Sequence, residues 1–205
     1  MGKSNMFECD LQFPHAYEVN ECPELPGSGQ SDLDLHYFPP PRARSEHDGL
    51  WLEVCPRSGQ KWLGVFAHGY VSPSAISRVL STPHPTYVCV ISSGQAYIVN
   101  TCDPQEWSIV HVIPVTDARS LPQHQILLFV GFSSVTAWGR DGKVWQAQFP
   151  VDGITLTEVT PWLIEGFGYN PAEGGDTSFE IDTKTGRILR RPCGKPSALG
   201  SRKKR

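Results

Sequence analysis

The chain has 205 residues, 39% of them hydrophobic and 19% charged, with a formal net charge of −3. These values are compatible with one folded domain plus tails. No apolar run approaches the roughly 20 residues that cross a bilayer, and the first residues, MGKSNMFECD, lack the apolar centre of a secretory signal. We therefore expect a soluble, cytoplasmic protein with no membrane partner.

Residues 1–48 show little hydrophobic periodicity. They are rich in Pro, Gly, Ser and Asp, which interrupt regular secondary structure, as in CPELPGSGQSDLD and FPPPRARSEHDG. Consecutive prolines favour an extended polyproline conformation and do not fit a central strand. We interpret this region as an extended, Pro-rich arm, and simple disorder is the alternative. Its aromatic residues could anchor it on the body of the protein: Phe7, Phe13, Tyr17, Tyr37 and Phe38.

From residue 49 to residue 192 the pattern becomes that of an all-β domain. Four segments share alternating apolar residues, a short turn and a second run that opens on a large apolar residue. Each is expected to form a β-hairpin. The segments are LWLEVCPRSGQKWLGVF, AYIVNTCDPQEWSIVHV, VTAWGRDGKVWQAQF and SFEIDTKTGRIL.

The opening residues of the second runs are Trp62, Trp107, Trp145 and Leu189 when the four segments are aligned. Further strands precede the second and third hairpins, in TYVCVI and QILLFVGF, and PWLIEGFGY is a candidate before the fourth. The unit is therefore an antiparallel meander of at least three strands, and its spacing of about 40 residues is typical of a propeller blade.

The strand followed by a turn like D-x-x-T-G-x-x-W resembles the blade hairpins of β-propeller repeats of the quinoprotein and WD40-like kind. The segments depart from that pattern, since none has a WD dipeptide, the second has Pro104 where the others have Gly, and the fourth lacks the Trp. The resemblance implies a small or incomplete propeller of three to four units, and a twisted sandwich is the alternative.

One segment, SPSAISRVLST from Ser72 to Thr82, is expected to form a short helix. Proline follows serine at its start, and Ile76, Val79 and Leu80 are spaced three and four residues apart.

The last residues, 193–205, are expected to form a flexible basic tail. Eight Lys or Arg and no acidic residue lie between Gly186 and Arg205, so the preceding 185 residues carry a formal charge of −11. The cations of the tail are separated by Pro, Gly and Ser without an aromatic residue, which does not favour nucleic acid as a partner.

The six cysteines contain no CxxC pair, and the seven histidines contain no HxH, HxxxH or HExxH spacing. This pattern predicts separate thiols and no metal site, although Cys89 and Cys102 would be the pair to join if a disulfide formed. No cofactor-binding motif is apparent either.

Each candidate catalytic residue could instead have a purely structural role. His68, in FAHGY, could act with nearby carboxylates in a hydrolase, or could be an ordinary surface histidine. The pairs Ser92-Ser93 and Ser133-Ser134 occupy the same place in two units, which favours a repeated turn over an active site. We therefore assign no catalytic residue.

The loop GFGYNPAEGGDT, from Gly166 to Thr177, combines an aromatic ring, an amide and two acids on a Gly-rich backbone. We predict that it contacts a partner protein or a polar ligand, and that the turns at Arg140-Asp141 and Lys184-Thr185 contribute. The predicted contact residues are Tyr169, Asn170, Glu173, Asp176, Arg140 and Asp141.

Together these patterns predict a non-catalytic binding module whose partner is unknown. Two alternatives are a hydrolase that uses carboxylates or His68 and a structural subunit of an oligomer.

Overall fold

A computed structural model describes residues 8–22, 33–40, 48–70 and 72–193. The described residues form four β-sheets and one short 3₁₀ turn, η1 (Pro122–His124). The predicted all-β class is therefore confirmed. No helix in the described part of the chain is long and apolar enough to pass through a lipid bilayer.

The first two sheets each include strands formed by residues that precede residue 49. The first sheet has the strand order β2 (Tyr17–Glu21), β4 (Gly49–Pro56), β5 (Trp62–Ala67), β3 (Asp34–Phe38). The second has the order β1 (Glu8–Asp10), β6 (Arg78–Ser81), β7 (Tyr87–Ser92), β8 (Gln95–Asn100), β9 (Trp107–Val110). Two of these pairings, β1 with β6 and β3 with β5, are parallel, whereas the other pairings are antiparallel.

The last two sheets are simple antiparallel meanders. The third runs β10 (Asp117–Leu121), β11 (Ile126–Val130), β12 (Ser134–Gly139), β13 (Gly142–Gln148). The fourth runs β14 (Asp152–Val159), β15 (Leu163–Asn170), β16 (Gly175–Asp182), β17 (Ile188–Cys193). In both sheets the spatial order of the strands follows the chain.

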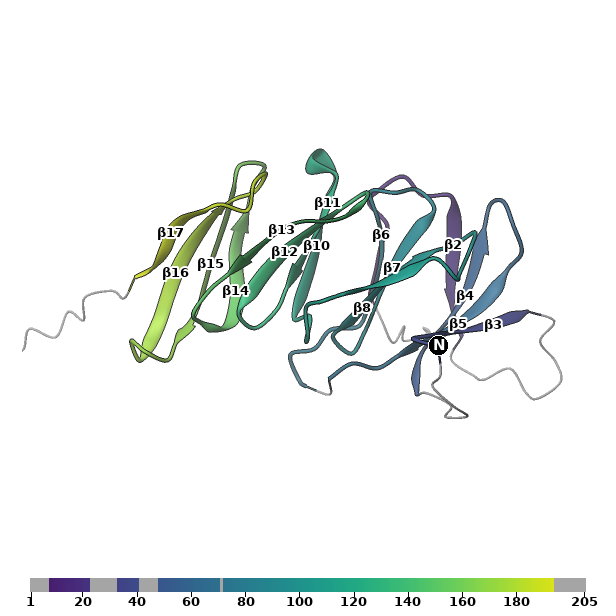
Figure 1. The fold of residues 1–205 in the computed structure, drawn as a ribbon, viewed down its shortest axis with the longest axis horizontal. Helices are drawn as coiled ribbons and strands as arrows, with labels where there is room; N and C mark the ends of the chain where they lie inside the picture. Colours follow the sequence, from purple (N-terminus) through teal and green to yellow (C-terminus); the bar gives the residue numbers. More distant parts are fainter. Residues whose placement is uncertain (1–7, 23–32, 41–47, 71, 194–205) are drawn as a thin grey trace, which may run out of the picture.

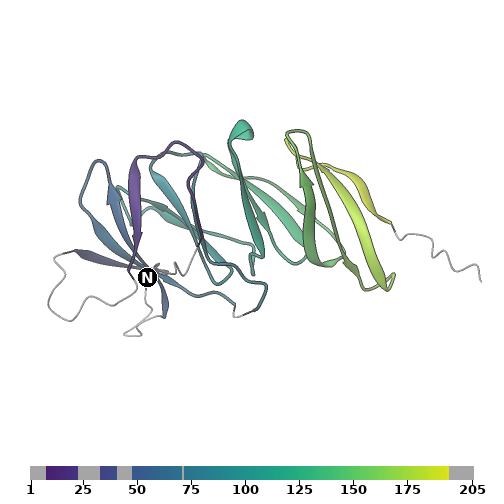
Figure 2. The same cartoon turned by 180° about the vertical axis from the view of Figure 1, so that it is seen from behind.

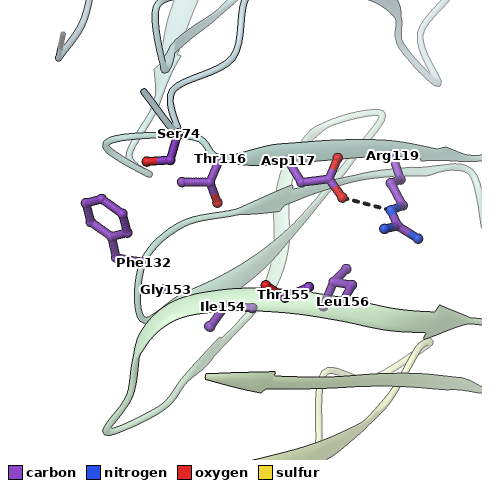
Figure 3. Close-up of a pocket in the computed structure, with 9 residues that line it drawn as sticks. All are labelled: Ser74, Thr116, Asp117, Arg119, Phe132, Gly153, Ile154, Thr155 and Leu156. Carbon is purple, nitrogen blue, oxygen red and sulfur yellow. Dashed lines mark hydrogen bonds and ion pairs between the residues drawn. The ribbon is translucent and has the colours of Figure 1, made fainter. Parts of the chain in front are cut away.

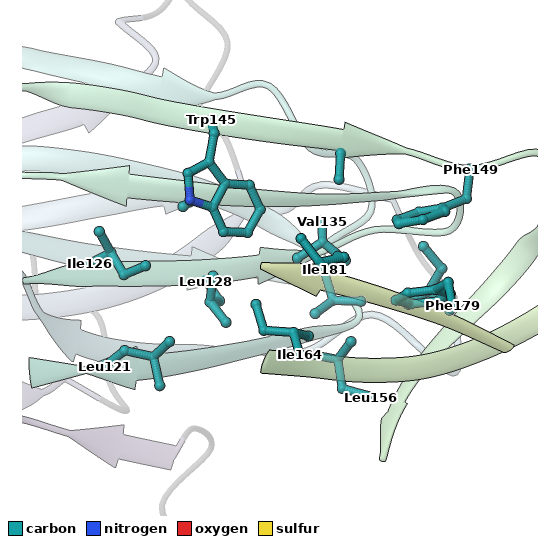
Figure 4. Packing of buried hydrophobic residues seen from close by; sticks show 14 of the residues in the cluster. Leu121, Ile126, Leu128, Val135, Trp145, Phe149, Leu156, Ile164, Phe179 and Ile181 are labelled. Atoms are coloured by element: carbon teal, nitrogen blue, oxygen red, sulfur yellow. The ribbon is translucent and has the colours of Figure 1, made fainter. Parts of the chain in front are cut away.

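The four sheets stand face to face in a row, and the first and fourth lie at opposite ends of the long axis (Figures 1 and 2). Three apolar clusters fill the spaces between neighbours: first with second, second with third, and third with fourth. Figure 4 shows the last of these, in which Phe149 stacks on Phe179 with ring centroids 4.2 Å apart. The arrangement is propeller-like but incomplete, because the end sheets do not meet.

The four predicted hairpins are confirmed as β4–β5, β8–β9, β12–β13 and β16–β17. The alignment of their large residues is only partly right. Trp62 and Trp145 point toward the next sheet along the chain, whereas Trp107 packs against the preceding one. Leu189 is 53% exposed, and its neighbour Ile188 packs against the core instead.

The predicted helix over Ser72–Thr82 is wrong, because Arg78–Ser81 is strand β6. In β6, Val79 joins the cluster toward the first sheet and Leu80 joins the cluster toward the third. A strand buried on both faces carries consecutive apolar residues, which a helical spacing can imitate over a few positions.

The arm predicted over residues 1–48 contributes β1, β2 and β3, and Phe13, Tyr17 and Phe38 are buried. Phe7 and residues 194–205 lie outside the described residues. The division into arm, body and tail stays a prediction. Among the described cysteines, Cys9, Cys22, Cys55, Cys89 and Cys102 are free thiols, as expected.

The turn between β16 and β17 offers a test of the packing between the third and fourth sheets. Gly186 has φ +70°, and a Cβ placed on it would lie 2.5 Å from Cδ2 of Trp145. Gly174 has a similar φ of +67°, but a Cβ there would meet nothing within 4 Å. We expect Gly186→Ala to lower the free energy of unfolding by about 2 kcal/mol or more, because it adds a steric clash to the cost of a left-handed residue.

The matched variant Gly174→Ala carries the backbone cost alone, so we expect it to lose only about 1 kcal/mol. Urea unfolding of both variants measures the difference. Equal losses would show that the turn moves away from Trp145 without cost.

Candidate functional site

A groove lies between the second and third sheets, with a volume of about 600 Å³. We call it the aromatic groove. The second sheet supplies one wall, and the end of β12 with the following turn supplies the other. Its lining consists of His84, Tyr87, Ile98, Glu106, Trp107, Ser108, Trp138, Arg140, Asp141 and Gly142.

The wall from the second sheet is held by a local hydrogen-bond network. The Tyr87 backbone N–H donates to the His84 carbonyl, and their rings meet edge to face at 4.8 Å. Asn100, which pairs with Tyr87 across β7 and β8, donates from Nδ2 to Glu106 at 2.8 Å. The Glu106 carboxylate also accepts a hydrogen bond from the Tyr87 hydroxyl. The phenol and the carboxylate are thus fixed side by side at the mouth of the groove.

Burial, the largest cause, and the hydrogen bond to Glu106 raise the pKa of Tyr87 to about 12. The same hydrogen bond, followed by the one from Asn100, holds the pKa of Glu106 below its usual value. Near neutral pH the groove therefore presents a protonated phenol beside an anionic carboxylate.

The wall from the third sheet ends in Trp138, Arg140 and Asp141. The register of β12 with β13 shifts between Ala137 and Trp138, and such bulges bend a strand and redirect a side chain. Trp138 is half-buried and packs against the cluster shared with the second sheet. Arg140 and Asp141 follow on an exposed turn.

Of the residues in the aromatic groove, the sequence predicted Arg140 and Asp141 but not Tyr87, Glu106 or Trp138. One signal was available for Trp138. It is a tryptophan just before the turn of a hairpin whose other tryptophan, Trp145, already fills the core position. Tyr87 begins β7 and Glu106 lies in the turn just before β9, and only the pairing of β7, β8 and β9 brings them together.

A second, smaller groove of about 350 Å³ lies between the edge strands β10 and β14 (Figure 3). Its charged groups are occupied with one another. The Asp117 carboxylate accepts from Arg119 Nε at 2.9 Å, from the Ala118 backbone N–H at 2.8 Å and from Arg78 at 3.5 Å. Arg78 also donates to the Ala118 carbonyl and pairs with Glu8 of β1. This network ties the second sheet to the third.

The predicted loop from Gly166 to Thr177 is a β-hairpin formed by β15, β16 and a tight turn. Tyr169 is 49% exposed, and Glu173 and Asp176 are also exposed. Asn170 is buried, and its Oδ1 accepts the backbone N–H of Ala172 at 3.0 Å. We therefore interpret Asn170 as a turn-forming residue, whereas Tyr169, Glu173 and Asp176 stay candidates for partner contact.

This hairpin turn and the Arg140-Asp141 turn lie at opposite ends of their sheets. β13 leads away from Arg140 to the end where Ile154 N–H donates to the Phe132 carbonyl, and there Tyr169 pairs with Asp152. The turn that lies beside Trp145, near Arg140, is instead the one at Gly186. The structure therefore does not bring the six predicted residues together in one site.

His68 has two serine neighbours. Its Nδ1 lies 2.8 Å from Ser92 Oγ and 3.2 Å from Ser93 Oγ. Ser92 Oγ donates its only hydrogen to the Phe66 carbonyl at 2.9 Å, so it accepts from His68 Nδ1–H. A nitrogen that carries this proton cannot also take one from Ser93, so the geometry is not that of an activated nucleophile.

The backbone at Ser93 also has a structural explanation. Ser93 and Gly94 have φ values of +44° and +79°, as a two-residue hairpin turn with two left-handed positions requires. Among the described residues, no group of three His, Cys, Asp or Glu side chains is placed to hold a metal ion.

The outer face of the fourth sheet carries opposed carboxylates. Glu165 of β15 pairs with Glu158 of β14 on one side and with Glu180 of β16 on the other. Glu180 is also opposite Arg190 in the register of β16 with β17. Like charges directly opposite each other destabilise a sheet, so this row has an energetic cost.

Comparison with known proteins gives no family. No protein-family model matches the chain, and no curated protein matches it. Among solved structures, it is similar to a chain in the S. cerevisiae complex of Dbp5 with Nup159, Gle1, IP6 and ADP, with 12% identity and a TM-score of 0.41. It is also similar to the N-terminal domain of Nup159, with 13% identity and a TM-score of 0.41.

The matches cover 96% and 95% of this chain but only 56% and 55% of those chains. The chain therefore spans little more than half the length of the structures it resembles.

The bond between Tyr87 and Glu106 can be tested by titration. The folded state favours the protonated phenol, so the stability from this group is complete below its ordinary pKa of 10.0 and is lost as the pH rises through about 12. We expect Glu106→Gln to lower the pKa of Tyr87, because it removes the anion that opposes ionisation. Absorbance at 295 nm, taken as a difference from Tyr87→Phe in the same background, measures it. An unchanged midpoint would mean that burial alone sets the pKa.

The row of glutamates predicts a stabilising substitution. We expect Glu165→Gln to raise the free energy of unfolding by roughly 0.2 to 1 kcal/mol at low ionic strength, because it relieves repulsion on both sides. Glu173→Gln is the control, since Glu173 lies in a turn and is not paired across strands. Chemical denaturation with and without 1 M salt measures both, and a gain that persists in salt would contradict the electrostatic explanation.

Proposed function

We propose that this protein is a non-catalytic binding module that holds a polypeptide partner in the aromatic groove. The observation that carries the proposal is the composition of that groove. Tyr87, Trp138 and Arg140 line it together, and these residue types dominate the binding energy of protein interfaces.

The frame around the groove supports this role. Both walls are built on sheets whose other side chains form the central clusters, so the aromatic residues are presented on a rigid base. Rigid presentation lowers the entropy that binding would otherwise cost. The mixture of Glu106, Asp141 and Arg140 at its rim suits hydrogen bonds to a peptide backbone or to polar side chains of either charge.

The proposal is tested by comparing two tryptophans that differ in place. Trp138 lies in the aromatic groove, whereas Trp162 is 79% exposed on the turn between β14 and β15 of the fourth sheet. Tagged wild type, Trp138→Ser and Trp162→Ala are used to capture proteins from native lysate, with quantification by mass spectrometry. We expect a partner that wild type and Trp162→Ala retain and that Trp138→Ser loses by about tenfold or more, as for a hot-spot residue.

Because Trp138 also contacts the core, its substitution could reduce binding by destabilising the fold. A second variant distinguishes this effect from the loss of a binding contact. Arg140→Ala with Asp141→Ala changes only exposed turn residues of the same groove, and we expect it to weaken capture of the same partner. Thermal unfolding establishes that each variant is folded. A partner lost with Trp162→Ala but kept by both groove variants would contradict the proposal.

A further inference from the structure

The outer face of the fourth sheet is a sheet face without a neighbour among the described residues. The second and third sheets are packed on both faces, and the fourth stands at the end of the row (Figures 1 and 2). Its inner face joins the cluster with the third sheet through Ile164, Phe179 and Ile181. Because side chains alternate along a strand, the residues between these point away from the core.

These outward residues form an aromatic row along β15. Phe167 is 37% exposed and Tyr169 is 49% exposed, and they occupy alternate positions on the same side of the strand. Leu189 of β17 is 53% exposed on the neighbouring part of the sheet. A monomeric protein gains nothing by leaving such residues together in water, so the face has the apolar element of an interaction surface.

Acidic residues flank this row on both neighbouring strands. Tyr169 pairs with Asp152 of β14 and with Asp176 of β16, so it has an aspartate on each side. Four positions back along β15, Glu165 stands between Glu158 and Glu180. Phe167 therefore lies between two acidic groups that are four residues apart along the strand direction.

The internal interfaces have a different character. Between the third and fourth sheets lies an apolar cluster, which Figure 4 shows with Leu128, Val135 and Ile164. If a second copy met this face with its own fourth sheet, Glu158 and Glu165 of one copy would approach those of the other, and like charges close together are unfavourable. Charge complementarity instead favours a partner that brings cations to the acidic positions.

We propose that the outer face of the fourth sheet binds an extended peptide segment of a partner protein in which basic and apolar residues alternate on one side. An extended chain presents every second residue to a surface, at a spacing that matches Glu165, Phe167 and Tyr169 along β15. Lysine or arginine residues pair with the acidic groups, and an apolar residue between them covers Phe167. The site is separate from the aromatic groove, so the two proposals stand or fall independently.

The test uses a fluorescein-labelled peptide, Lys-Thr-Leu-Thr-Lys-Thr-Leu-Thr-Lys, with the full chain and fluorescence anisotropy at low salt. The control peptide has Glu in place of each Lys. We expect binding of the lysine peptide, no binding of the glutamate peptide, and loss of binding in 1 M salt, where the Debye length falls to about 3 Å. Equal binding of both peptides would overturn the proposal.

Matched variants locate the site. Glu158→Gln with Glu165→Gln removes two charges from the outer face, and Glu106→Gln with Asp141→Asn removes two from the aromatic groove. We expect the first pair to weaken binding by roughly fivefold or more, as for two exposed ion pairs, and the second pair to leave it unchanged. Phe167→Ala with Tyr169→Ala should also weaken it. The reverse pattern would assign the peptide to the groove and overturn the proposal.

The chain's own basic residues are the competing occupant. Residues 194–205 follow β17 directly and carry Lys195, Arg202, Lys203, Lys204 and Arg205. A variant with Gln at these five positions separates the cases. If the lysine peptide binds wild type within about twofold of this variant, an external segment has access to the face. If only the variant binds it, the chain's own segment holds the face and the proposal of an external partner is overturned.

Discussion

Burial of apolar side chains between successive sheets is the interaction on which the rest of this structure depends. A sheet with two apolar faces needs a neighbour on each side, and the second and third sheets have both. Each fully buried Val, Leu, Ile or Phe contributes about 1.5 to 3 kcal/mol, so these clusters outweigh any of the exposed ion pairs. The row of sheets follows from this demand, and the aromatic groove lies between two sheets that share one of these clusters.

The ends of the row satisfy the same demand differently. The fourth sheet alternates buried Ile164 and Phe179 with carboxylates and hydroxyls on its other face. Terminal units of stacked folds need such a polar outer face to stay soluble. The aromatic residues among those carboxylates are more than solubility requires, and they distinguish this face from a simple cap.

The sequence predicted the hairpins because alternation and turn residues are local signals. Trp62 and Trp145 lie where the repeat placed them, and the glycine of the turn before Leu189 has the left-handed backbone that a reversal requires. β6 was mistaken for a helix because Val79 and Leu80 are buried on opposite faces, which removes the alternation. The aromatic groove could be predicted only in part, because Tyr87, Glu106 and Trp138 come together through register and a bulge, which leave no local pattern.

The two halves of the chain differ in the sequence separation of their paired strands, because both parallel edge strands belong to the first two sheets. β1 pairs with β6 across 70 positions, from Glu8 to Arg78, and β3 pairs with β5 although β4 lies between them in the chain. The third and fourth sheets, by contrast, pair each strand with the next one along the chain. Contacts close in sequence form fast, whereas distant ones wait for a long loop to close. We therefore expect the C-terminal half to fold by pairing each strand with the next. We expect the N-terminal strands β1 and β3 to pair later, with sheets that have already formed.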